Sequence, residues 1–83
     1  MNREDVLAVI NQVLRNNGSA PAADAPVPLR EAGFRSLDFS EVALRIEDKL
    51  DCELNFEASS MRRIATISDV VDFFVGATAE HAG

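Results

Sequence analysis

Ser36 is the residue of this sequence whose surroundings most suggest chemistry. It carries a nucleophilic hydroxyl, stands between Arg35 and Leu37, and begins an amphipathic run shortly after a glycine. Two interpretations are open from these residues alone: a helix N-cap that accepts backbone N–H groups, or a point of covalent attachment. A Ser–His hydrolase has little support, because the only histidine, His81, lies in a small polar C-terminal stretch.

The other side chains with reactive or metal-binding groups are few. One cysteine and one histidine cannot form an internal disulfide or a Cys/His zinc site. Cys52 has no base beside it in the sequence, so we expect it to be a half-buried structural residue. Arg62 and Arg63 make a small basic spot that offsets part of the acidic charge.

Acidic residues gather on the run that begins at Ser36. Leu44 is expected to face outward among Glu41, Glu47 and Asp48. One interpretation is a solvated charged face, as most charge runs are. The other is a docking surface, since an apolar contact framed by charges is common at protein interfaces.

The overall charge limits the classes of partner. The 83 residues include 14 acidic and 8 basic side chains, a net charge of −6. This balance argues against nucleic acid and anionic membranes and favours partners with basic surfaces. No apolar run approaches the roughly 20 residues of a membrane span. The start "MNREDV" does not resemble a signal peptide, so we expect a cytoplasmic location. We also expect the protein to be a monomer.

Helical periodicity divides the chain into elements. Apolar residues recur at helical spacing over residues 2–16, with Asn2 as a possible N-cap, and again over residues 36–50. Residues 56–65, "FEASSMRRIA", look like a short helix. Thr66 and Asp69 have the spacing of a capping box ahead of a last helix. Residues 17–35 are predicted to be a long loop that Leu29 and Phe34 hold against the core. Residues 76–83 are predicted to be a frayed C-terminal tail.

These elements predict an all-α fold, a four-helix bundle with three longer helices and one short helix in a single domain over residues 1–83. No segment reads as a convincing strand. The predicted core takes apolar residues from the three longer helices. They are Val6, Ile10, Val13, Leu14, Leu37, Val42, Ile46, Leu50, Ile67, Val70, Val71 and Phe74.

The order of these residues resembles the acyl and peptidyl carrier protein family. That family has the attachment motif L-x-E-x-G-x-D-S-L, a following helix with E-x-x-x-x-x-E-[DE], and a last helix with T-x-x-D-x-x-x-x-[IVF]. The last pattern is similar to "TISDVVDFF" here, and the resemblance extends from Val6 to Val75. The residues in register with the first two patterns are Leu29, Glu31, Gly33, Ser36, Leu37, Glu41, Glu47 and Asp48.

The resemblance implies a 4′-phosphopantetheine arm, derived from coenzyme A, attached to Ser36 through a phosphodiester. Such a chain is a non-catalytic carrier of acyl or aminoacyl thioesters. Its implied partners are a phosphopantetheinyl transferase, an acyltransferase or adenylating ligase, and a ketosynthase or other downstream synthase. The residues expected to dock partners are Arg35, Leu37, Asp38, Glu41, Leu44, Glu47, Asp48 and Arg62.

Arg35 departs from the family pattern, which has Asp directly before the serine. This reversal of charge suggests a dedicated loading or transfer enzyme, and with the Ala/Pro-rich loop it favours a polyketide or hybrid peptide–polyketide route. Three alternatives stay open: a housekeeping fatty-acid carrier, a D-alanyl carrier, and a small helical interaction domain without the arm.

Overall fold

The computed structural model describes residues 1–54 and 62–79. In that part of the chain the helices are α1 (Arg3–Asn16), α2 (Leu29–Ala32), α3 (Ser36–Leu50) and α5 (Ile67–Thr78). No strand occurs among the described residues; an isolated antiparallel bridge joins Pro28 to Thr66. The prediction of an all-α fold is confirmed.

The bounds of α1 follow from its end residues. The side chain of Asn2 accepts the N–H of Asp5 at 2.8 Å, which caps the helix as predicted. Glu4 and Asp5 lie in the first turn, where the helix dipole favours negative charge. The helix ends at Asn16, ahead of a turn in which Gly18 has φ +78°.

The predicted long loop contains a helix that we did not expect. α2 has only four residues, and its first residue, Leu29, follows Pro28. It ends at Gly33, which has φ +74°, a conformation that favours glycine. A Cβ at Gly33 would also lie 3.0 Å from Ser19 Oγ. The backbone angle therefore favours glycine here, and a larger residue would also have to displace the Ser19 hydroxyl.

α5 starts at the predicted capping box and ends later than expected. The Thr66 hydroxyl accepts the N–H of Asp69 at 3.2 Å, and the Asp69 carboxylate accepts the N–H of Thr66 at 3.1 Å. The helix continues through Gly76, where we expected the tail to begin, to the fully buried Thr78. The short helix predicted over residues 56–65 falls largely outside the described residues, and residues 62 and 63 form a turn.

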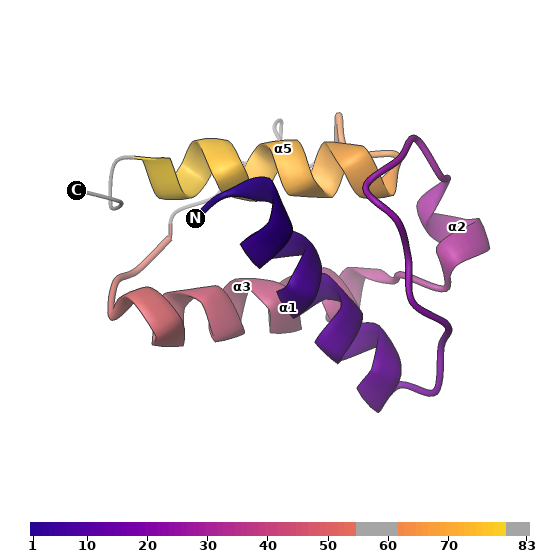
Figure 1. Ribbon diagram of the computed structural model, residues 1–83, viewed down its shortest axis with the longest axis horizontal. Coiled ribbons are helices and arrows are strands. Elements are labelled where there is room, and N and C mark those ends of the chain that lie inside the picture. The colour runs from indigo at the N-terminus through magenta and orange to yellow at the C-terminus, as the bar shows by residue number, and fades with distance from the viewer. Residues whose placement is uncertain (55–61, 80–83) are drawn as a thin grey trace.

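Figure 1 shows how the longer helices pack. α3 and α5 cross the view in the same direction, while α1 lies in front, begins beside α5 and crosses α3. α1 contacts both helices, and Phe39 of α3 meets Phe74 of α5 with ring centroids 5.0 Å apart. α2 lies at the end of the molecule where α3 and α5 both begin (Figure 1).

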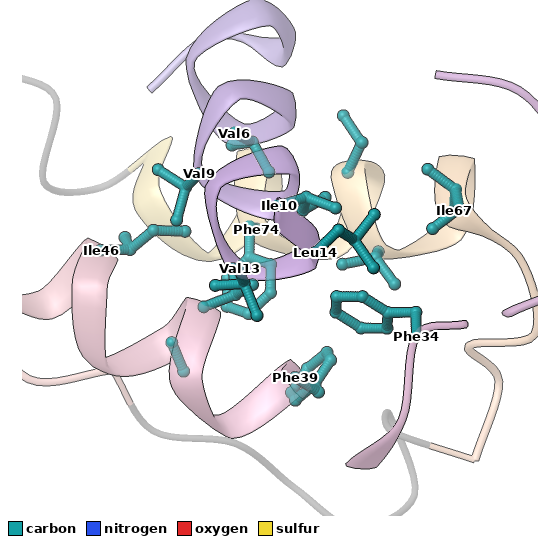
Figure 2. Close-up of a cluster of buried hydrophobic side chains, with 14 of the residues drawn as sticks. Val6, Val9, Ile10, Val13, Leu14, Phe34, Phe39, Ile46, Ile67 and Phe74 are labelled. Atoms are coloured by element: carbon teal, nitrogen blue, oxygen red, sulfur yellow. The ribbon is translucent and has the colours of Figure 1, made fainter. Parts of the chain in front are cut away.

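The apolar faces of these helices meet in one core (Figure 2). The prediction that Leu37 lies in the core is wrong, because its side chain is 82% exposed. Leu50, also predicted to be in the core, packs at its edge. All the others are buried. Phe34 is buried, as expected of a residue that holds the loop against the core. The residues that we did not place in the core and that are buried there are Val9, Phe39, Ala43 and Leu54.

Candidate functional site

Ser36 is exposed at the first position of α3. Phe34 and Phe39, two residues before it and three after it, are 4% and 6% exposed and point into the core (Figure 2). These two rings fix the backbone on both sides of the serine. The hydroxyl is thus presented to solvent from a segment that packing holds in place.

Ser36 is not the N-cap of α3, so that interpretation is wrong. The cap position is Arg35, whose side chain makes no cap hydrogen bond, since a guanidinium has no acceptor. The start of the helix is instead stabilised by Asp38, whose Oδ2 accepts the N–H of Arg35 at 2.8 Å. The Ser36 hydroxyl is therefore not used to begin the helix.

Asp38 is a structural residue, which corrects its expected place on the docking surface. Its side chain is 4% exposed and so cannot meet a partner. Besides the N–H of Arg35, it accepts a hydrogen bond from the side-chain amide of Asn17 at the end of α1. Burial of this carboxylate is possible because both of its oxygens have hydrogen-bond donors.

Backbone hydrogen bonds join the segment before α2 to the start of α5. The N–H of Leu29 donates to Ala65 O at 3.1 Å, and the N–H of Ile67 donates to Val27 O at 2.9 Å. The N–H of Ser68 donates to Ala25 O at 3.0 Å. These bonds place α2 beside the start of α5, at the same end of the molecule as Ser36 (Figure 1).

A pocket of about 400 Å³ opens beside Ser36. Its walls are mainly apolar, and its polar side chains are two arginines and the serine itself. An apolar hollow with a few convergent polar groups is the usual form of a small-molecule site. The lining residues are Leu29, Arg30, Phe34, Arg35, Ser36, Phe39 and Ile64.

The charged side chains that line this pocket are both positive, in an otherwise acidic chain. Arg30 and Arg35 are exposed, and neither forms an ion pair with a carboxylate of the described residues. Arg45, by contrast, pairs with Glu41 at 3.1 Å. Arg35 also lies at the positive end of the α3 dipole, where a cation is unfavourable by a few tenths of a kcal/mol. The pocket therefore presents unpaired positive charge next to a hydroxyl.

The other residues expected to dock partners are spread along α3 and beyond it. Leu44 is 65% exposed, as predicted, and Leu37 is exposed two turns before it on the same face. Asp48 is exposed. Glu47 has a structural contact as well, because its Oε2 accepts the N–H of Leu54 at 2.7 Å. Arg62 is exposed in the turn after residues 55–61 and does not line the pocket.

A second, acidic hollow lies at the other end of α3. It has a volume of about 580 Å³, and Asp51, which ends the helix with φ +51°, forms part of it. Cys52 is half-buried, as predicted, and no cluster of three or more metal-ligating side chains occurs in the described part of the chain. The lining residues are Leu44, Glu47, Asp48, Asp51, Cys52 and Glu53.

Comparison with known proteins identifies the family of this chain. A family model described as "Phosphopantetheine attachment site" matches residues 4–74. The chain belongs to this family. It is therefore a non-catalytic carrier whose prosthetic group is 4′-phosphopantetheine, and members of the family interact with phosphopantetheinyl transferases and synthase enzymes.

A solved structure shares the fold of this carrier. The solution structure of the acetyl actinorhodin acyl carrier protein from Streptomyces coelicolor superposes with a TM-score of 0.69 and 21% identity. The match covers 99% of this chain and 95% of that one. No curated protein matches the carrier by sequence. In the described residues, no helix combines the length and apolar character needed to cross a bilayer.

Two residues of the site could not be found from the sequence of the carrier. Arg30 stands between two motif residues, Leu29 and Glu31, and only the fold brings it to the pocket beside Ser36. In the sequence, Asn17 looks only like part of the signal that ends the first helix. Its contact with Asp38 cannot be predicted from this signal, because the two residues are 21 positions apart. Neither position carries a local pattern that predicts its contact.

Proposed function

We propose that Ser36 carries the 4′-phosphopantetheine arm through a phosphodiester and that this chain holds acyl or aminoacyl thioesters for partner enzymes. The observation that carries the proposal is the position of Ser36: exposed, at the first residue of α3, and at the mouth of a pocket. Its hydroxyl has no structural role in the cap of the helix. The family match supports the kind of group that is attached.

The residues around Ser36 fit the group. The first-turn N–H groups of an α-helix have no partners within the helix, and they attract phosphate. Arg30 and Arg35 add positive charge, and Leu29, Phe39 and Ile64 supply apolar wall beside it. When bound, the arm supplies a terminal thiol that holds the cargo as a thioester. The chain itself orients the attachment point and keeps the cargo at a high local concentration for the partner.

Intact mass spectrometry tests the attachment. The purified chain is incubated with coenzyme A and a permissive phosphopantetheinyl transferase. The natural sequence should gain the mass of one phosphopantetheinyl group, and Ser36→Ala should gain none. Ser40→Ala is the matched control, because Ser40 is also exposed and lies one turn further along α3, and it should gain the full mass. No gain in the natural sequence, or a gain that survives Ser36→Ala, contradicts the proposal.

We propose the exposed face of α3 as the docking surface for the transferase, for the acyltransferase or adenylating ligase, and for a ketosynthase or other synthase. Leu37 and Leu44 give this face two exposed apolar contacts, and Asp48 gives it negative charge. Truncation of a central apolar contact often costs 1–2 kcal/mol of binding, so Leu44→Ala should slow transfer about 5–30-fold. Its urea midpoint should stay unchanged. An unchanged transfer rate at both low and high salt contradicts this surface.

For the pathway we propose polyketide or hybrid peptide–polyketide synthesis. Arg35 supports it, because a cation in place of the usual Asp suits a dedicated enzyme with a matching acidic contact. The acetyl form of the actinorhodin carrier, a structural neighbour, supports an acyl cargo. The mass of the thioester trapped from the native host distinguishes this cargo from a fatty acid and from D-alanine.

The alternative function, an interaction domain without an arm, predicts partner binding that Ser36→Ala leaves intact. The monomeric state and cytoplasmic location stay predictions.

A further inference from the structure

We propose that Arg30 and Arg35 form an anion subsite that holds the phosphodiester of the arm against the start of α3. The proposal rests on the attachment of the arm to Ser36 proposed above. It assigns to these two arginines a role in the modified carrier itself, before any partner is bound.

The first support is that both arginines line the same pocket as Ser36. The chain has 14 acidic and only 8 basic side chains, so carboxylates are plentiful. Arg3 pairs with Asp24 and Asp72, and Arg45 pairs with Glu41, whereas Arg30 and Arg35 pair with no carboxylate in the described residues. Two unpaired cations thus converge where the modification adds one negative charge.

The second support is that the backbone holds both positions before the anion arrives. The segment with Arg30 is fixed by the bond from Leu29 N–H to Ala65 O and by the bond from Phe34 N–H to Leu29 O at 2.9 Å. Arg35 is fixed by its own N–H, which donates to Asp38. A site whose backbone is already ordered loses less entropy when it binds its ligand.

The third support is the electrostatics of the helix start. In the unmodified chain Arg35 lies at the positive end of the α3 dipole, and Arg30 adds a second positive charge to the same pocket. A phosphate at this position forms charge-assisted hydrogen bonds with guanidinium groups. Arginine at position 35 is therefore unfavourable before modification and favourable after it.

The test compares unmodified and modified forms of the natural sequence, of the double variant Arg30→Gln/Arg35→Gln, and of the control Arg15→Gln. Arg15 is exposed at the end of α1 and does not line the pocket. Two readouts are followed: the Nε–Hε NMR signals of the arginines, and the thermal midpoint of the modified form minus that of the unmodified form. The midpoints are measured at about 0.02 M and about 1 M salt, because salt screens exposed charges.

Modification should shift the Nε–Hε signals of Arg30 and Arg35 and leave that of Arg15 in place. At low salt it should raise the midpoint by about 2–6 °C, the range expected for exposed ion pairs in a domain of this size. This gain should shrink at high salt and fall by at least half in the double variant. Arg15→Gln should keep the full gain.

Three outcomes overturn the subsite. If the natural sequence gains the mass of the arm but neither arginine signal moves, the arginines do not hold the phosphodiester. If the double variant keeps the full midpoint gain, the arginines do not hold the phosphodiester, and a loss of transfer from a partner would then mean that they serve only the acidic partner contact proposed above. If the natural sequence gains no mass, the attachment to Ser36 itself fails, and the mass spectrum alone identifies that failure.

Discussion

The side-chain amide of Asn17, at the end of α1, donates a hydrogen bond to the buried carboxylate of Asp38 in the first turn of α3. The same carboxylate accepts the N–H of Arg35, the residue before Ser36. One buried side chain thus joins the end of the first long helix to the start of the helix that presents the serine. The position of Ser36 depends on this contact as well as on the packing of its aromatic neighbours.

Asp38→Ala should lower the free energy of unfolding by about 1–3 kcal/mol, because it leaves both donors without their acceptor. Urea denaturation measures the change. Asp48→Ala is the control, since Asp48 lies on the same helix and is exposed, and its effect should stay within about 0.5 kcal/mol. Equal effects of the two substitutions contradict a structural role for Asp38.

Truncation should lower the stability strongly at one apolar residue of α3 and hardly at all at another. Ile46 is fully buried, so Ile46→Ala should cost about 2–5 kcal/mol, a large share of the stability of a small domain. Leu37 is 82% exposed, so Leu37→Ala should change the free energy of unfolding by less than about 0.5 kcal/mol. Urea midpoints compare them, and a large loss in Leu37→Ala would place that side chain in the core after all.

Alanine substitutions at two glycines should change the stability of the fold in opposite directions. Gly33→Ala forces an alanine into the left-handed region at a position where its Cβ meets Ser19, so it should destabilise the fold by at least about 1 kcal/mol. Gly76 lies within α5, and a Cβ there meets nothing within 4 Å. Gly76→Ala should therefore stabilise the fold by about 0.5–1 kcal/mol. Thermal melting measures both, and shifts of the same sign refute this account of Gly33.

The stability should fall at acidic pH through two carboxyl groups. The hydrogen bond from Arg3 lowers the pKa of Asp24, and the backbone N–H of Ala65, with Thr66, lowers the pKa of Asp69. A carboxyl whose pKa is lower in the folded chain stabilises the fold above its ordinary pKa, near 4. That contribution is lost as the pH falls from about 4 through the lower, folded pKa. Urea midpoints measured from about pH 6 down to pH 2 should show this decline.

Arg3→Gln separates the two groups. Without the guanidinium, the pKa of Asp24 should rise toward its ordinary value, while the pKa of Asp69 stays low as an internal control. NMR titration of the side-chain carboxyl carbons reads both directly. A pKa of Asp24 that does not move in Arg3→Gln contradicts the assigned cause.

Local patterns were enough to predict most of the fold. Residues 36–50 form the predicted helix, and Thr66 with Asp69 forms the predicted capping box, because both depend on residues close in sequence. Leu37 was misplaced because two registers fit the apolar residues of α3. The buried stripe runs through Phe39, Val42, Ala43 and Ile46, at spacings of three, four and seven, and Leu37 lies off it.

The features that could not be predicted depend on contacts between distant segments. α2 is too short to show a helical period, and backbone bonds to the start of α5 hold it in place. Asp38 looks like a surface acid until the fold brings Asn17 to it. The pocket beside Ser36 is a third case, because Ile64 joins its wall only in the folded chain.

The bridge between Pro28 and Thr66 makes the surroundings of Ser36 depend on distant parts of the chain. Its two residues are 38 positions apart (66 − 28), so the chain must close a long loop before the flanking bonds form, from Leu29 N–H to Ala65 O and from Ile67 N–H to Val27 O. α1 and α3, in contrast, each begin from bonds between near neighbours. A contact of long sequence separation is lost when the chain unfolds, because no local structure holds its two segments together. The surroundings of Ser36 therefore exist only in the folded chain, so an enzyme that recognises them selects folded molecules.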